Sequence, residues 1–331
     1  KGDFAYNKSY SKGYPMGAIK PLKMYDKGIV STLYICFRAK NNNNPSFFEQ
    51  YFDSGIINTE IEKIAQEGGR ANGLLNVSVK EFFKDIKIYT PRSEEQKKIA
   101  DCLSSVDEII LAQSKKLDAL KAHKKGLLQQ LFPEKDETIP KLRFPEFQEK
   151  ADWDIKPLGK VAFNLDSKRV PITQQDRVSG LTPYYGASGI IDYVEGYIFD
   201  DELLCVSEDG ANLIARTYPI AFSISGKTWV NNHAHVLKFE ERCTQVLVEN
   251  YLNLINLEDY LTGMAQPKLN RAKLDIIPIP LPGVIEQQRI ANCLSSIDEL
   301  IDAQNDKVRA IKNHKKGLMQ QLFPTENREA K

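Results

Sequence analysis

Apolar side chains recur in a strict alternation of four and three residues along two long stretches of the chain. This spacing is the heptad seam of a coiled coil, and it predicts two long helices, over Glu94–Leu131 and Glu286–Leu322. Ser93 and Gln96 form a capping-box pattern before the first helix, and Pro133 and Pro324 end the two helices. The predicted seam positions are Ile99, Leu103, Val106, Ile110, Gln113, Leu117 and Leu120 in the first helix, and Ile290, Leu294, Ile297, Ile301, Gln304, Val308 and Ile311 in the second.

The two heptad stretches are copies of one another. Residues 95–133 and 286–324 align at a constant offset of 191 and share 26 of 39 residues. Only two copies exist, and about 150 unrelated residues separate them, which excludes a solenoid of stacked repeats. The pattern indicates two matching helices that alternate with two other domains.

A helix with so narrow an apolar stripe needs a partner to bury it. We expect the two copies to pack on each other within the chain, antiparallel, with Gln113 and Gln304 specifying the register. The alternative is that each helix packs on a globular domain and the seam glutamines are merely tolerated. Gly126 and Gly317 lie inside the helices, where close approach of another chain or a frayed last turn would explain them.

The segments before each helix read as mixed helix and strand. Residues 181–217 and 226–239 predict short strands, 244–263 a helix, and 266–282 a polar loop with a final strand. The front of the chain shows the same order: a strand at 32–39, helix at 45–66, a polar loop, and a strand at 83–91. We therefore predict an α+β protein with a first domain at 1–93, a helix at 94–133, a second domain at 134–283, a helix at 284–324 and a tail at 325–331.

Composition narrows the class of protein. The net charge is +1, so binding to nucleic acid would have to depend on local patches. Five cysteines without a C-x-x-C pair favour reduced thiols in the cytoplasm, and no apolar run reaches the length of a membrane span.

Several motifs together resemble the specificity subunit of type I restriction–modification systems. They are KLRFPEF (141–147), YYGASGIIDY (184–193), WVNNHAHVL (229–237) and LPG-x-x-EQQRIA (281–291). The resemblance covers nearly the whole chain. It implies two target-recognition domains held apart by an antiparallel coiled coil, each reading half of a split site in double-stranded DNA. It also implies that the helices dock two methyltransferase subunits, with restriction subunits in the full complex. The KLRFPEF segment precedes only the second domain, so we expect the first domain to lack about 60 residues at its front.

Catalytic and metal-binding motifs are weak. NPSF (44–47) is similar to an amino-methyltransferase motif but lacks its second proline and the accompanying glycine loop, and we predict a non-catalytic chain without a cofactor. His233 and His235 could face one side of a strand, but no third ligand stands at a suitable spacing, so no metal site is predicted.

Polar loops supply the candidate DNA contacts, because Arg and Lys bind guanine and phosphates while Asn and Gln bind adenine. Two other classes remain open: a coiled-coil assembly scaffold that does not bind DNA, and a methyltransferase that acts alone. The candidates are Asn212, Arg216, Lys227, Asn231, Asn232, Gln266, Lys268, Asn270 and Arg271 in the second domain, and Lys12, Lys20 and Arg70 in the first.

Overall fold

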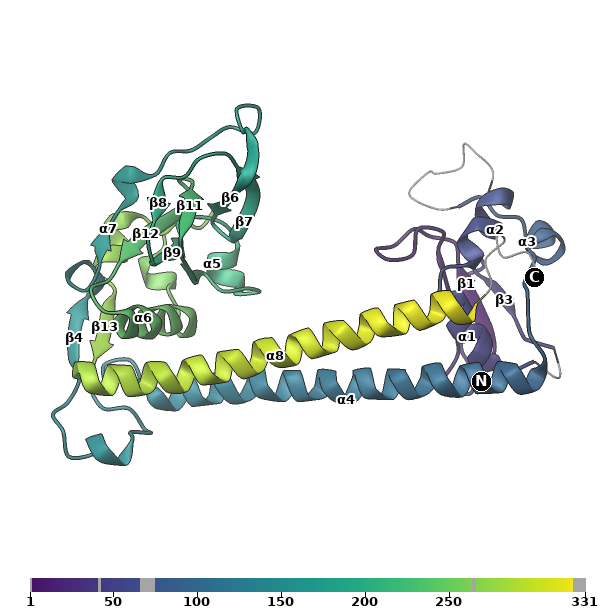
Figure 1. Cartoon of the computed structure of the whole chain (residues 1–331), viewed down its shortest axis with the longest axis horizontal. Helices are drawn as coiled ribbons and strands as arrows, with labels where there is room; N and C mark the ends of the chain where they lie inside the picture. The colour runs from purple at the N-terminus through teal and green to yellow at the C-terminus, as the bar shows by residue number, and fades with distance from the viewer. Residues whose placement is uncertain (1, 41–42, 66–74, 264–265, 324–331) are drawn as a thin grey trace. The chain divides into compact units, whose positions relative to one another are not determined.

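The computed structural model describes residues 2–40, 43–65, 75–263 and 266–323. The chain divides into two compact units. Unit 1 comprises residues 1–117 and 303–331, and unit 2 comprises residues 118–302. Each unit therefore contains part of both long helices together with its own globular region (Figure 1).

The two long helices are α4 (Ser93–Leu131) and α8 (Val284–Leu322), so the predicted helices are confirmed to within two residues at their starts. In unit 1, Asp107 of α4 bonds Lys315 of α8, and Gln113, further along α4, bonds Gln304, which lies earlier in α8. In unit 2, Lys124 of α4 bonds Asp298 of α8. The two helices are antiparallel, because residues later in α4 bond residues earlier in α8. All of the predicted seam residues are buried or half-buried.

A glutamine near the start of each long helix bonds the loop that precedes that helix, which the sequence did not predict. Gln96 Nε2 donates to the carbonyl oxygen of Pro91 at 2.9 Å, and its repeat partner Gln287 donates to that of Pro282 at 2.8 Å. Gln96 also accepts from the backbone N–H of Asn44. The predicted capping box is wrong, because this side chain reaches the preceding loop and ties the helix to it.

Unit 1 is built on a three-stranded antiparallel sheet in the order β2 (Ala18–Pro21), β1 (Phe4–Asn7), β3 (Ile35–Phe37). Aromatic residues dominate its core, where Phe47 and Tyr51 contact Phe323 next to the end of α8. The helices of this unit, besides its parts of α4 and α8, are α1 (Pro45–Asp53), α2 (Ile57–Ile64) and α3 (Val79–Asp85).

Unit 2 contains two four-stranded sheets and a two-stranded ribbon. One sheet has the order β10-β9-β12-β5 and the other β7-β6-β11-β8, while β13 pairs with β4. The strands are β4 (Asp154–Pro157), β5 (Phe163–Asn164), β6 (Ser179–Gly186), β7 (Gly189–Val194), β8 (Phe199–Asp200), β9 (Leu203–Ser207), β10 (Ala221–Ile224), β11 (Lys227–Val230), β12 (Ala234–Lys238) and β13 (Pro278–Leu281).

Helix α6 (Arg242–Leu254) lies between the first of these sheets and the helix pair (Figure 1). Its Val248 and Leu252 join the sheet core, while Cys243 and Leu247 pack with Leu294 and other residues of α4 and α8. Short helices complete the unit: η2 (Pro145–Phe147), η3 (Leu158–Lys160), η4 (Asp166–Lys168), α5 (Asn212–Ala215), η5 (Glu258–Tyr260) and α7 (Arg271–Asp275).

The predicted α+β class is confirmed, but several local predictions need correction. The predicted strand at 83–91 is wrong: α3 occupies its first part, and no strand forms in the rest. The corresponding strand of unit 2, β13, forms because β4 pairs with it. The helix predicted at 45–66 is divided at Gly55, whose φ of +77° suits glycine, and residue 66 lies outside the described residues. The helix predicted at 244–263 ends at Leu254.

In the described part of the chain, we find no helix that is both long enough and apolar enough to cross a membrane.

Candidate nucleic-acid interface and helix surface

The predicted DNA contacts separate into two groups once burial and hydrogen bonds are known. Four of them hold the fold of unit 2 together. The other seven described candidates are exposed, and Arg70 lies outside the described residues.

The side chain of Arg216 caps the C-terminal end of α6. Its guanidinium donates to the carbonyl oxygens of Leu213, Leu252 and Ile255 at 2.9 to 3.1 Å. Burial lowers the pKa of Arg216 from its ordinary value. With these donors committed to backbone carbonyls, we remove Arg216 from the candidate contacts.

Three asparagines are also committed to internal bonds. Asn212 is buried and bonds the backbone of Thr217 and Tyr218. Asn231 is buried and accepts from the N–H of His233, and Asn270 caps α7 by accepting from the N–H of Lys273. Asparagine caps helices and closes turns through its side-chain oxygen, whereas binding to adenine uses both its donor and its acceptor, and residue type alone did not distinguish these roles.

The exposed candidates keep polar atoms at the surface. Lys268 pairs with Glu208 at 3.2 Å, and Arg271 pairs with Asp275 at 3.5 Å. Lys227 lies over the ring of Tyr197, and in unit 1 Lys20 bonds Asp53 and lies over Tyr14. The candidates that remain are Lys227, Asn232, Gln266, Lys268 and Arg271 in unit 2, and Lys12 and Lys20 in unit 1.

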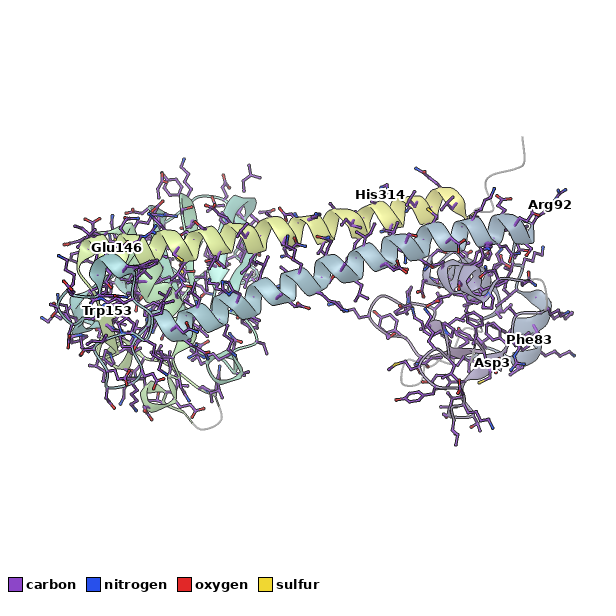
Figure 2. All side chains as sticks on the ribbon, turned by 90° about the horizontal axis from the view of Figure 1, so that it is seen from below. Asp3, Phe83, Arg92, Glu146, Trp153 and His314 are labelled. Carbon is purple, nitrogen blue, oxygen red and sulfur yellow. The ribbon has the colours of Figure 1, made fainter. Side chains whose placement is uncertain are left out.

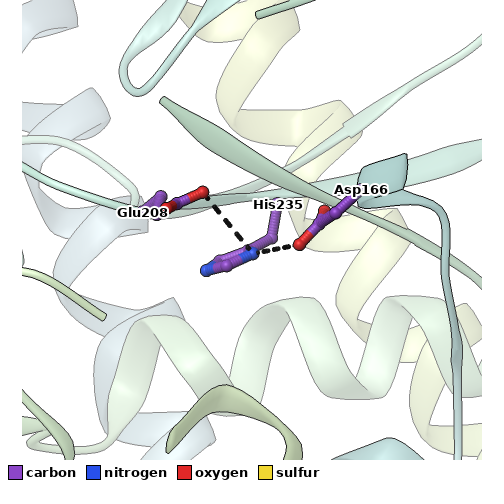
Figure 3. A group of neighbouring side chains, drawn as sticks. All are labelled: Asp166, Glu208 and His235. Atoms are coloured by element: carbon purple, nitrogen blue, oxygen red, sulfur yellow. Dashed lines mark hydrogen bonds and ion pairs between the residues drawn. The ribbon is translucent and has the colours of Figure 1, made fainter. Parts of the chain in front are cut away.

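Unit 2 contains an ionic cluster that sequence reasoning missed, and Figure 3 shows three of its side chains, Asp166, Glu208 and His235. The cluster comprises Asp166, Arg169, Glu208 and His235. Asp166 Oδ2 lies 2.6 Å from Nδ1 of His235, and Arg169 Nη1 lies 2.7 Å from Glu208 Oε2. His235 Nε2 lies 2.7 Å from the carbonyl oxygen of Leu269. A carboxylate and a carbonyl only accept hydrogen bonds, so both contacts are satisfied when each ring nitrogen carries a proton.

The charges of the cluster stabilise one another. Burial raises the pKa of Asp166, but the hydrogen bond from His235 and the bonds from Val236 and Asn164 together hold it below its ordinary value. Burial likewise opposes ionisation of Glu208, and Arg169, His235 and Lys268 together lower its pKa.

The cluster side chains also bond the backbone of β12, and backbone bonds link the three loops that carry Glu208, His233 and Leu269. Arg169 donates to the carbonyl oxygen of Ala234, and Asp166 accepts from the N–H of Val236. Leu269 donates its N–H to the carbonyl oxygen of Glu208, and the N–H of Glu208 donates to the carbonyl oxygen of His233. The loop that carries Asn232 and the loop that carries Gln266 and Lys268 are thereby fastened to each other. No sequence signal marks this arrangement, because its members are far apart in ordinary polar loops.

The cluster brings to His235 two carboxylates that no spacing in the sequence indicated. Asp166, Glu208 and His235 place ligand atoms within 4.8 Å of one another. However, both nitrogens of His235 are bonded and Arg169 neutralises the carboxylates. This donor set suits an internal ion-pair network better than a metal ion. His233 stands apart at the surface, paired with Asp209.

The outer sides of α4 and α8 carry matching residues in the same order, identical at four of five positions and isoleucine or leucine at the fifth. Exposed or half-exposed positions at alternating spacings of three and four residues lie on one face of each helix. On neighbouring exposed positions the copies differ, as at Leu111 and Asp302 or Lys115 and Asp306. We call the shared surface the repeated outer face. It comprises Cys102, Ser105, Ile109, Ala112 and Lys116 on α4, and Cys293, Ser296, Leu300, Ala303 and Lys307 on α8.

Comparison with known proteins assigns the family. The family model described as "Type I restriction modification DNA specificity domain" matches residues 9–122 and 150–313. The chain belongs to this family. The matched residues include most of both globular regions and both long helices, in agreement with the resemblance seen in the sequence motifs.

Individual relatives agree with this assignment. A Haemophilus influenzae protein provisionally named a type I restriction enzyme specificity subunit is 38% identical over 152 residues, which are 46% of this chain and 39% of that protein. The chain thus spans well under half of that relative's length. The type I restriction enzyme MjaVIII specificity subunit of Methanocaldococcus jannaschii is 26% identical over 325 residues, 90% of this chain and 74% of that protein.

Solved structures show the same fold. The type I restriction–modification S subunit from M. genitalium matches with a TM-score of 0.59 at 14% identity, covering 89% of this chain and 76% of that one. A chain from a structural study of assembly and conformational transition of a type I restriction–modification system matches with a TM-score of 0.59 at 16% identity, covering 97% and 81%.

Proposed function

We propose that this chain is the DNA-specificity subunit of a type I restriction–modification complex, with each unit reading one half of a split duplex site. The family match over both units is the observation that carries the proposal. The exposed candidates on loops that the ionic cluster holds in place support it, since bases are read by polar side chains held in a fixed position. The scaffold alternative has no comparable support from the relatives.

The experiment is selection from a random duplex pool by the purified full chain together with methyltransferase subunits. We expect enrichment of two short sequences separated by unread bases. A pool that stays random while the complex remains intact would contradict the proposal and favour the scaffold. In this proposal the chain does no chemistry itself and works in the cytoplasm.

Two copies of one methyltransferase subunit dock on the repeated outer face in this proposal. Each unit carries one copy of the central part: Cys102, Ser105 and Ile109 in unit 1, and their counterparts at 293, 296 and 300 in unit 2. The apolar residues Ile109 and Leu300 are 48% and 57% exposed, so each leaves an apolar side chain free for a partner. Gly126 and Gly317 lie within regular helix. An added Cβ on either would meet nothing within 4 Å, so the described chain leaves space beside both glycines.

Single substitutions test this stoichiometry. Ile109→Glu or Leu300→Glu should each leave a complex with one methyltransferase copy, and the double variant should bind none, as measured by native mass spectrometry. Leu111→Glu is the matched control, because Leu111 is 56% exposed but has Asp302 as its counterpart. Loss of both copies from a single variant would contradict two independent docking faces.

A further inference from the structure

The two units share the pairing of two strands: adding 200 to the residue numbers of β1 and β3 gives the register of β9 and β12, whereas β2 and β10 correspond at an offset of 202. In unit 1, Phe4 pairs with Phe37 and Tyr6 with Ile35. In unit 2, Leu204 pairs with Leu237 and Val206 with His235. This equivalence makes unit 2 an internal reference for what each part of unit 1 should contact, and the helix repeat supplies the same reference at an offset of 191.

The first difference lies before the long helices. β13 pairs with β4, and its Ile279 is 1% exposed. The counterpart of Ile279 in unit 1 is Ile88, which is 37% exposed, and the described residues provide no strand beside it. The N–H of Lys87 donates to Glu60 Oε2, but among the described residues the N–H groups of Ile88 and Thr90 have no partner. Unpaired backbone groups beside an apolar side chain are a template for another strand. Phe83, close to this segment at the end of α3, is exposed as well (Figure 2).

The second difference lies at the start of each helix. Glu286 is 3% exposed; Arg143 bonds it through two nitrogens at 2.8 Å, and Trp153 Nε1 lies 3.4 Å from it. Its identical counterpart, Glu95, is exposed, and nothing in the described part of unit 1 plays the part of Arg143 or Trp153.

The third difference lies in the loop that follows β2. β11 of unit 2 pairs with β6 on one side and β8 on the other, and Thr228 and Val230 are fully buried. The corresponding stretch of unit 1, the loop between β2 and β3, forms no strand. Val30 is 46% exposed, and Ile29 is fully exposed.

The fourth difference lies at the sheet edge. β12 pairs with β5, as well as with β9. Its counterpart β3 pairs with β1, and among the described residues no strand covers its other edge. The partners that unit 2 uses at all four places, Arg143, Trp153, β4, β5, β6 and β8, come from one continuous stretch, residues 143–200.

We infer that unit 1 presents a docking face for a polypeptide segment with the plan of residues 143–200. The face comprises the backbone at 87–90, Glu95, the loop at 28–30 and the open edge of β3. The occupant must supply an arginine for Glu95 and strands for the three backbone edges. This inference depends on the internal comparison alone and stands whether or not the chain reads DNA.

A grafted chain tests the inference. Residues 139–201 of this protein are joined in front of Gly2 of the full chain, which keeps the offset of 200. Hydrogen exchange at Ile88, Thr90 and Val30 is compared in the grafted and ungrafted chains. We expect exchange at these amides to slow by at least about tenfold, because new strand pairs protect them. A graft of the same composition in scrambled order should give no protection.

The glutamate supplies a matched pair of variants. In the grafted chain, Glu95→Gln should weaken the protection at Ile88 and Thr90, while Glu94→Gln at the neighbouring exposed position should leave it unchanged. The same segment added as a separate peptide gives a second measurement if the graft fails to fold. Unchanged exchange in both formats would overturn the inference. So would protection of these amides in the ungrafted chain that rises with protein concentration, since a second copy would then be the occupant.

Discussion

The side-chain amide of Gln304 donates to Gln113 twice, to its backbone oxygen at 2.9 Å and to its side-chain oxygen at 3.0 Å. These two residues are counterparts in the helix repeat, so the two copies contact each other there through equivalent positions. Two ion pairs follow the same symmetry. Asp107 pairs with Lys315, and their counterparts Asp298 and Lys124 pair with each other, all at an offset of 191. The polar seam positions thus specify one antiparallel register.

Replacing the glutamines should separate stability from register. Gln304→Leu alone leaves the polar groups of Gln113 without their donor, and we expect a loss of about 1 kcal/mol or more in the free energy of unfolding. Replacing both by leucine should restore or exceed the original stability, because an apolar seam packs better. The double variant should also form mixed oligomers in light scattering after size exclusion. A single clean species would show that the glutamines do not set the register.

The ion pair in unit 1 should show coupling in a double-mutant cycle. Lys315→Asp places two carboxylates together, and adding Asp107→Lys restores an opposite pair. We expect a coupling of about 0.5–1 kcal/mol, since Asp107 is 44% exposed and solvent screens the pair. Urea unfolding measures it. The symmetric exchange at Lys124 and Asp298 should give the same value within error, and zero coupling at both would contradict a structural role.

Acid should weaken unit 2 through the ionic cluster. The pKa values of Asp166 and Glu208 are lowered below 3.8 and 4.5 in the folded chain. Groups with depressed values add stability above the ordinary value, and this stability is lost as the pH falls through the folded value. The midpoint temperature of thermal unfolding should therefore drop steeply below about pH 4. Asp166→Asn should unfold earlier at neutral pH and show a shallower acid dependence; an equally steep dependence would contradict the assignment.

Exposed cations beside the cluster should govern DNA affinity. Changing Lys268 and Arg271 to alanine together should weaken binding and reduce the salt slope by roughly one unit per lost phosphate contact. Fluorescence anisotropy at several salt concentrations measures both quantities. Lys135 and Lys141 are the matched control, because they are exposed and ion-paired, with Asp259 and Glu134, and are not among the candidate contacts. Equal losses in both double variants would indicate non-specific charge effects.

The sequence predicted best those features whose signal lies within a single segment, and it failed where a feature depends on residues elsewhere in the chain. The heptad seam is local and periodic, and every predicted position from Ile99 to Ile311 is buried or half-buried. The strand predicted at 83–91 failed because a strand needs a neighbour, and no pattern within the segment says whether one exists. Arg216 and Asn231 were assigned to DNA by residue type, but their roles follow from backbone partners that only the fold supplies.

In the proposed function, the length of the two long helices sets the gap between the two half-sites. α4 has 39 residues and is about 58 Å long. Deleting Ile110–Lys116 together with Ile301–Lys307 shortens both helices by about 10 Å, keeps the spacing of the apolar seam and allows both lysine–aspartate pairs to form. Because it also removes Gln113 and Gln304, the full-length variant with leucine at both positions is the control. Methylation mapping by the complex with its methyltransferase partners should show the gap between the half-sites reduced by about three base pairs, at about 3.4 Å each, with the bases read unchanged. An unchanged gap in a correctly folded complex would contradict the claim.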